Sequence, residues 1–197
     1  MDEPFADDQG VQWMQAFQAG SEKAFDHLVE AYSGQVYALF TRFLGHVPER
    51  EDLVQEVFLR VLRSRDRYTP TARFSTFLYR VAFNLAVNHT ERNKNSRSLD
   101  EGGLDEDGSP NNIPAAQHGD PAQQLETDDV VHAVRDAIAS LPESQRMALI
   151  LAKYEELSFS EIAVVLGSSE KAIKSLVHRA RESLRERLKP FLEKELA

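Results

Sequence analysis

The chain has 197 residues, no cysteine and a formal net charge of −9. This length suits one domain or two small ones, and the lack of cysteine excludes disulfides and thiolate metal sites. The amino terminus has no basic segment followed by an apolar one, and no apolar run approaches the ~18 residues of a membrane span. The sequence therefore predicts a soluble, cytoplasmic protein.

The net charge conceals an uneven distribution along the chain. Residues 98–139 carry one basic and ten acidic residues, whereas residues 42–97 carry eleven basic and six acidic ones. Residues 171–189 carry seven basic residues against two acidic ones. Two basic surfaces on either side of an acidic spacer favour a protein that binds a polyanion.

Helical periodicity dominates the first half of the sequence, and no strand pattern or internal repeat is present. A helix is predicted over 11–19, where Gly20 ends it, and another begins after Ser21. A third helix is predicted over 35–44. The next follows Pro48 and carries acidic residues in its first turn, as the helix dipole favours. After a turn around Pro70, a further helix is capped by Ser75.

Residues 93–127 differ from the rest in being rich in proline and glycine and poor in apolar residues. Such a segment cannot bury enough surface to offset the entropy of ordering it, so it is predicted to be a flexible, acidic linker. Helices resume over 128–140 and 142–154. The prediction is thus an all-α protein of two small helical domains.

The carboxy-terminal part has the pattern of a helix-turn-helix. Ser158 and Glu161 form a capping box, Gly167 breaks the helix, and Ser168 or Ser169 caps the next one. The second helix has one apolar side and a polar, basic outer face, which is typical of a helix that enters the major groove. The alternative is a solvated amphipathic helix in an ordinary bundle. His178 has no partner at ligand spacing, which favours a phosphate or base contact over a metal site.

The segment 73–88 interleaves aromatic residues with arginine and asparagine. Arginine and amide side chains beside aromatic rings suit unstacked bases, because stacking tolerates any sequence and amides add hydrogen bonds. The alternative is that Phe74, Phe77 and Phe83 belong to the core. The functional hypothesis therefore rests on four other residues: Arg73, Tyr79, Arg80 and Asn84.

Two long stretches resemble a known family. Region two of the extracytoplasmic-function (ECF) sigma factors is similar to EDLVQEVFLRVLRSRDRYTPTARFSTFLYRVAFNLAVN. Region four of the same family is similar to ASLPESQRMALILAKYEELSFSEIAVVLGSSEKAIKSLVHRARESLRE. The resemblance implies a region 2 helical bundle over 1–95, a flexible acidic linker over 96–127 and a region 4 helix-turn-helix domain over 128–197.

The resemblance also implies the roles of individual residues. The segment that docks on the clamp helices of core polymerase contains Asp52, Leu53, Val54, Gln55 and Glu56, and Arg60 is another polar residue that the core does not need. The segment that melts and reads the minus-ten element contains Arg73, Phe74, Ser75, Thr76, Phe77, Tyr79, Arg80 and Asn84. The helix that reads the minus-thirty-five element contributes Ser169, Lys171, Lys174, Ser175, His178, Arg179 and Arg181.

The partners that the resemblance implies are bacterial core RNA polymerase, promoter DNA and an anti-sigma factor, with no catalytic residue, metal or cofactor. Several positions depart from the usual family pattern. Phe77 replaces a tryptophan, Phe83 replaces a frequent arginine, and Leu176-Val177 replaces Arg-Leu. Glu155-Glu156 replaces Glu-Gly. These differences leave the promoter sequence open.

Two competing hypotheses remain at this stage. A repressor or activator could use the helix-turn-helix alone, although residues 42–97 resemble neither a sensor domain nor a dimerisation helix. An enzyme would need a glycine-rich phosphate loop, a metal cluster or a nucleophile–base pair, and the sequence offers none of these. A repressor must bind DNA tightly by itself, whereas a sigma factor requires core polymerase.

Overall fold

The computed structural model describes residues 5–45, 47–100 and 131–195, and every regular element among them is helical. The amino-terminal bundle consists of α1 (Gln9–Gln18), α2 (Glu22–Leu44), α3 (Arg50–Arg63), the short 3-10 helix η1 (Arg65–Arg67) and α4 (Phe74–Asp100). The carboxy-terminal unit contains a helix over 131–139, α6 (Glu143–Tyr154), α7 (Phe159–Leu166) and α8 (Glu170–Glu195). The all-α prediction is confirmed.

The domain boundaries stay predictions. Helix α4 continues to Asp100, past the predicted domain end at 95. The rest of the predicted linker, 101–127, lies outside the described residues.

Helix α2 is a single long helix where the sequence predicts two. It runs without interruption from Glu22 to Leu44 through Gly34, which is exposed and has no neighbour near its missing Cβ. An interior glycine costs only about 1 kcal/mol. Burial of the fully covered Leu28 and Leu39 outweighs that cost.

Helix α4 occupies the centre of the amino-terminal bundle. It packs against α1, α2 and α3, and its residues Leu78, Ala82 and Ala86 are fully buried. At its amino end, Phe74 meets the rings of Tyr32 and Tyr68 at centroid distances of 5.1 and 6.3 Å. These contacts hold the amino end of α4 in the core of the bundle.

The helix-turn-helix forms as its capping residues predict. Ser158 and Glu161 make both hydrogen bonds of a capping box at the start of α7. Gly167 ends α7 at φ 61°, a left-handed conformation that glycine adopts without strain. The Ser169 hydroxyl then accepts a hydrogen bond from the amide of Ala172 at 3.2 Å, which caps α8.

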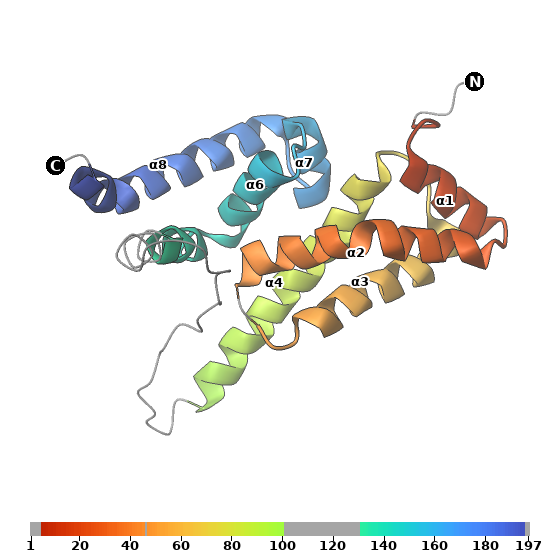
Figure 1. Cartoon of the computed structure of the whole chain (residues 1–197), viewed down its shortest axis with the longest axis horizontal. Coiled ribbons are helices and arrows are strands. Elements are labelled where there is room, and N and C mark those ends of the chain that lie inside the picture. Colours follow the sequence, from red (N-terminus) through yellow and green to blue (C-terminus); the bar gives the residue numbers. More distant parts are fainter. Residues whose placement is uncertain (1–4, 46, 101–130, 196–197) are drawn as a thin grey trace, which may run out of the picture.

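The two halves of the molecule pack directly on each other. Helix α7 lies against α4, and α6 lies against the carboxyl end of α2 (Figure 1). Buried side chains of both halves, among them Phe43 and Ile162, belong to one continuous apolar cluster. The arrangement is therefore closed, with α6 and α7 covering part of the amino-terminal bundle.

A glycine in α1 gives a test of this packing. A Cβ at Gly10 would lie 2.5 Å from the Tyr32 hydroxyl and 2.7 Å from the Cβ of Phe74. We expect Gly10→Ala to lower the free energy of unfolding by about 1–3 kcal/mol, as overpacking does. The measurement is urea denaturation followed by circular dichroism.

Gly34→Ala is the matched control, because the same change in α2 meets no neighbour. This variant should stabilise the protein by about 0.5–1 kcal/mol through helix propensity. Equal effects of the two substitutions would contradict the close approach of α1 to α4.

Candidate polymerase and nucleic-acid interfaces

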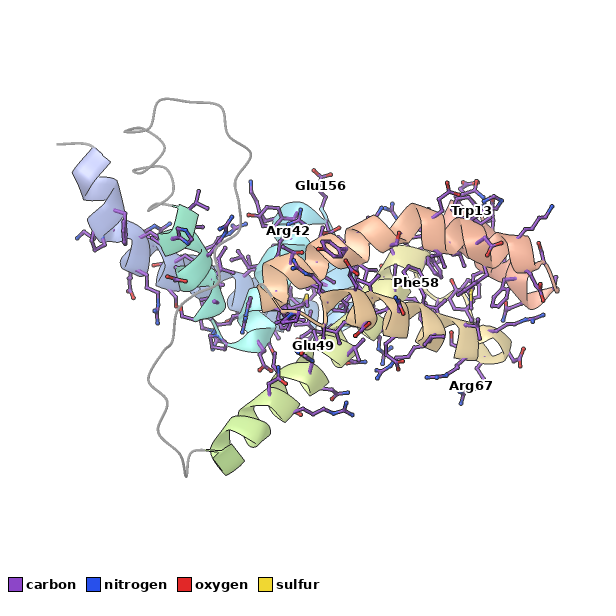
Figure 2. All side chains as sticks on the ribbon, turned by 60° about the horizontal axis from the view of Figure 1, so that its bottom comes forward. Trp13, Arg42, Glu49, Phe58, Arg67 and Glu156 are labelled. Atoms are coloured by element: carbon purple, nitrogen blue, oxygen red, sulfur yellow. The ribbon has the colours of Figure 1, made fainter. Side chains whose placement is uncertain are left out.

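The outer face of α3 combines carboxylates with exposed leucines. Asp52 and Gln55 are exposed, and Leu59 and Leu62 follow on the same face with exposed fractions of 46% and 43%. Glu56 beside them forms ion pairs with Arg60 at 3.0 Å and Arg63 at 3.6 Å. Figure 2 shows Glu49, Phe58 and Arg67 along this segment.

The α3 face agrees in part with the sequence prediction. Of the predicted docking residues, Leu53 is buried and Val54 is half-buried against the core. Leu59 and Leu62 were not predicted, because three-to-four spacing identifies an apolar stripe without telling which leucines lie beyond its edge. Exposed leucines beside charged groups are typical of a protein-binding face.

A polar stripe runs along one face of α4. Arg73, just before the helix, is followed by Phe77, Arg80 and Asn84, which recur at helical spacing. Arg73, Arg80 and Asn84 are exposed, whereas the Phe77 ring is half-buried and packs on Tyr68 at 5.1 Å. The stripe thus offers one aromatic edge between cationic and amide groups.

Three other residues predicted for the minus-ten element point into the protein. Phe74 and Thr76 are fully buried, and Tyr79 is only 2% exposed. Phe83 is half-buried and meets Phe43 edge-on at 6.2 Å, so the position at which arginine is frequent supports the core here. The aromatic residues of α4 therefore serve packing more than the sequence pattern indicates.

The outer face of α8 is polar and basic over its first three turns. Lys171, Lys174, His178, Arg179 and Arg181 are exposed. Ser175 is half-buried and accepts a hydrogen bond from the Arg179 guanidinium at 2.9 Å. Lys174 pairs with Glu170 at 2.7 Å on the same helix. All seven predicted minus-thirty-five residues lie in the first turns of α8 or at its cap.

A cluster of polar contacts joins the two halves around Glu155, directly after α6. One carboxylate oxygen of Glu155 pairs with Arg42 at 3.1 Å, and the other accepts a hydrogen bond from the Tyr79 hydroxyl. The Glu155 side chain is only 10% exposed. The Arg42 guanidinium also lies 4.6 Å from the centroid of the Tyr154 ring. In Figure 2, Arg42 at the end of α2 lies beside the loop that carries Glu156.

Further contacts join the halves on either side of this cluster. The Arg146 guanidinium donates a hydrogen bond to the Phe43 carbonyl at 2.8 Å, and Thr90 donates to the Glu143 carboxylate at 3.0 Å. Arg73 pairs with Glu161 at 3.6 Å. Residues predicted to read DNA are thus bound to acidic residues of the other half.

The ionisation of these groups follows their surroundings. Burial raises the pKa of Tyr79, and its hydrogen bond to the Glu155 carboxylate raises it further, so the phenol keeps its proton and donates it. Burial lowers the pKa of Arg146. Burial alone would raise the pKa of Glu161, but hydrogen bonds from Ser158 and the charge of Arg73 hold it below the usual value.

The backbone after Glu155 is unusual. Glu156 has φ 53°, in the left-handed region that non-glycine residues seldom adopt. This is the position at which the family commonly has glycine, so the structure gives the physical reason for that preference.

Neither a metal site nor a membrane span emerges from the described part of the chain. There, no group of three or more histidine, aspartate or glutamate residues is arranged to hold a metal ion. None of the helices described combines the length and the apolar character that crossing a bilayer requires.

Comparisons with known proteins agree on one family. The family profile "Sigma-70 region 2" matches residues 28–96, and "Sigma-70, region 4" matches residues 132–184. The RNA polymerase sigma-H factor of Pseudomonas aeruginosa is 31% identical over 94% of this chain and 96% of its own length. The ECF RNA polymerase sigma factor SigW of Bacillus subtilis is 31% identical over 86% of this chain and 91% of its own.

Solved structures have the same fold. The sigma factor RpoE in complex with the anti-sigma factor NepR from Bartonella quintana superposes with a TM-score of 0.66 and 23% identity, over 85% of this chain and 98% of that one. CnrH in complex with the cytosolic domain of CnrY gives a TM-score of 0.64 and 23% identity, over 93% and 99% of the two chains.

The capping box of α7 yields a prediction for stability against pH. A carboxylate whose pKa is lowered by folding stabilises the folded state above its unfolded pKa, and this contribution is lost as the pH falls. We expect Glu161→Gln to destabilise the protein at pH 7. The gap in the free energy of unfolding between this variant and wild type should narrow below pH 4.5, the ordinary pKa of the group.

Glu156→Gln removes a charge from an exposed carboxylate in the loop that precedes α7 and serves as the control. Denaturant titrations at several pH values measure, for each variant, the difference from wild type in the free energy of unfolding. A gap for Glu161→Gln that stays constant down to pH 3 would contradict the role assigned to the carboxylate.

Proposed function

The chain belongs to the ECF family of RNA polymerase sigma factors, and we propose that three of its exposed faces divide core binding and promoter reading among them. As a member of this family it binds core RNA polymerase, directs transcription initiation at promoters and is not an enzyme. The roles of individual residues are the proposal.

The observation that carries this function is the presence of both sigma-70 regions, in order, on one chain. A repressor that used the helix-turn-helix alone would give no reason for the match over residues 28–96. A relative of similar length that aligns over 94% of the chain supports the same conclusion.

We assign core binding to the α3 face. The predicted residues there are Asp52, Leu53, Val54, Gln55, Glu56 and Arg60, and we add the exposed Leu59 and Leu62 as apolar anchors. Exposed apolar groups supply the burial that a stable interface needs, and the carboxylates around them provide electrostatic complementarity. Helix α3 lies on the opposite side of α2 from α6 and α7 (Figure 1).

We assign minus-ten recognition to α4. The exposed stripe of Arg73, Phe77, Arg80 and Asn84 suits a single strand, because cations hold the phosphates while an aromatic edge and amides contact bases. Ser75, in the first turn of α4, is half-buried and lies on another side of the helix from the stripe. Phe74 and Thr76 support α4 from within the core, and Tyr79 becomes available only when α6 and α7 move away.

We assign minus-thirty-five recognition to α8. Its seven predicted residues, from Ser169 to Arg181, form a basic face at the amino end of a helix-turn-helix recognition helix, and this is the geometry that reads a major groove. Control by an anti-sigma factor and a cytoplasmic location, where core polymerase works, belong to the same proposal.

Reconstituted transcription tests the function directly. Core polymerase with and without the protein would transcribe fragmented genomic DNA of the source organism, and sequencing would map the transcript starts. We expect starts that appear only with the protein and share elements near minus ten and minus thirty-five. The same set of starts with core alone would refute the function.

The exposed leucines of α3 test the core-binding face. Leu59→Ser with Leu62→Ser should weaken binding to core by about tenfold or more, because apolar anchors at an interface contribute over 1 kcal/mol each. The thermal unfolding midpoint should change little, because both side chains are already exposed. Fluorescence anisotropy of the labelled protein titrated with core measures the affinity.

Val164→Ser on α7 is the control for that pair, since its side chain is equally exposed, at 44%, but lies on another helix. Unchanged affinity of the double variant for core polymerase would exclude the α3 face as the docking site.

The amide of Asn84 tests the minus-ten reader. The protein is proposed to open the duplex by binding energy, and flipping a base out of the stack costs a few kcal/mol. Asn84→Ala should therefore leave core binding intact and reduce permanganate reactivity of minus-ten thymines. A promoter already mismatched over minus ten should restore part of it.

Asn93→Ala is the matched control on the same helix, where the amide is exposed and contacts His89 at 3.1 Å. Wild-type opening by Asn84→Ala on the matched duplex would exclude this residue from the reading surface.

A further inference from the structure

Two residues of the proposed minus-thirty-five surface contact each other one helical turn apart. The Ser175 hydroxyl accepts two hydrogen bonds from the guanidinium of Arg179, one from Nε at 3.3 Å and one from Nη2 at 2.9 Å. Residues four positions apart lie on the same side of a helix, so the two side chains meet without any distortion of α8. Ser175 is half-buried, whereas Arg179 is exposed.

The two hydrogen bonds use one particular edge of the guanidinium. The N–H of Nε and the neighbouring N–H of Nη2 form the side edge of this planar group, and both are donated to the same oxygen. The end of the fork, formed by Nη1 and the second N–H of Nη2, is not used by this contact. That end carries two parallel donors, which match the O6 and N7 acceptors of a guanine in the major groove.

The partner of Arg179 also differs in charge from those of its neighbours on α8. Lys174 pairs with the carboxylate of Glu170 at 2.7 Å, and Arg185 pairs with that of Glu182. A carboxylate neutralises the cation that it holds, whereas a hydroxyl does not. Arg179 is therefore held in one direction while its full positive charge remains for DNA.

We propose that Ser175 is a positioning residue, which acts on the minus-thirty-five element through Arg179 by directing the end of the guanidinium fork at one guanine. The proposal rests on the function assigned to α8 above. It gives Ser175 a role other than direct contact with DNA, and it assigns a base to one position of the element.

The physical advantage of such a contact lies in preorganisation. A long arginine side chain has many rotamers, and restricting them on binding costs conformational entropy. The serine restricts Arg179 before DNA arrives, so less freedom is lost in the complex. Attraction to phosphates needs only the charge, whereas bidentate contact with a base needs the direction as well. Loss of Ser175 should thus reduce base selection more than general affinity for DNA.

The first experiment measures base selection by the holoenzyme. Core polymerase with the protein would transcribe a promoter library randomised over the minus-thirty-five element, with the minus-ten element taken from mapped starts. We expect Arg179→Ala to lower the preference for guanine at one position by about tenfold or more. Ser175→Ala should lower the preference at the same position by about fivefold, as the loss of one hydrogen-bonding group does. Ser175→Thr, which keeps the hydroxyl, should restore it.

Ser183→Ala is the matched control, because it removes the same hydroxyl from a half-buried serine of α8 about two turns further along. This variant should select bases as wild type does. Alanine favours a helix more than serine does, so neither substitution should unfold α8, and circular dichroism checks this.

The second experiment is a double-mutant cycle on promoter binding. If Ser175 acts only through Arg179, Ser175→Ala should cost no further affinity in a protein that already carries Arg179→Ala. A serine that touched a phosphate itself would cost the same in both backgrounds. Lys171→Ala provides the comparison, because a separate phosphate contact should weaken all sequences equally in both backgrounds and lower the salt slope by about one.

These outcomes separate the role of Ser175 from the function on which it rests. Wild-type guanine preference in Ser175→Ala, or an equal cost of this change with and without Arg179, would overturn the positioning role and leave α8 as the reader. A wild-type holoenzyme that starts at specific sites but selects no base over minus thirty-five would instead refute the assignment of α8, and the positioning role with it.

Discussion

The burial of α4 is the constraint on which the rest of the structure depends. Leu78, Ala82 and Ala86 fill the amino-terminal core and fix the rotation of the helix about its axis. That rotation turns Arg80 and Asn84 towards solvent. It also turns Tyr79 towards α6 and α7, where it meets Glu155. With 3.6 residues per turn, one helix presents a core face, a solvent-exposed polar face and a face covered by the other half.

The elements that the sequence predicts well are those with local signatures. The capping box at Ser158, the left-handed Gly167 and the cap at Ser169 each depend on hydrogen bonds within a few residues, and all three occur as predicted. The prediction of one helix after Ser21 and another over 35–44 was wrong, because the local cost of Gly34 is smaller than the burial that holds α2 together. Local propensity there yields to tertiary packing.

The contact between the halves could not be predicted from the sequence. Arg42 and Glu155 are separated by 113 positions. Helical periodicity predicts that one face of a helix is buried, but it does not predict which segment of the chain covers that face. Tyr79 was assigned to stacking because it lies off the core stripe, yet the other half of the chain occupies that face. Leu62 shows the opposite error, since its three-to-four spacing from buried residues predicts a place in the apolar stripe and yet it lies exposed at the edge.

Several basic residues of this acidic chain form ion pairs with its own carboxylates. Affinity for DNA without sequence preference depends on how many cations are free to replace counterions on phosphates. In the closed arrangement Arg42 and Arg73 are paired with Glu155 and Glu161, and Lys174 is paired with Glu170 on its own helix. Acidic residues of the chain thus neutralise these three cations within the molecule.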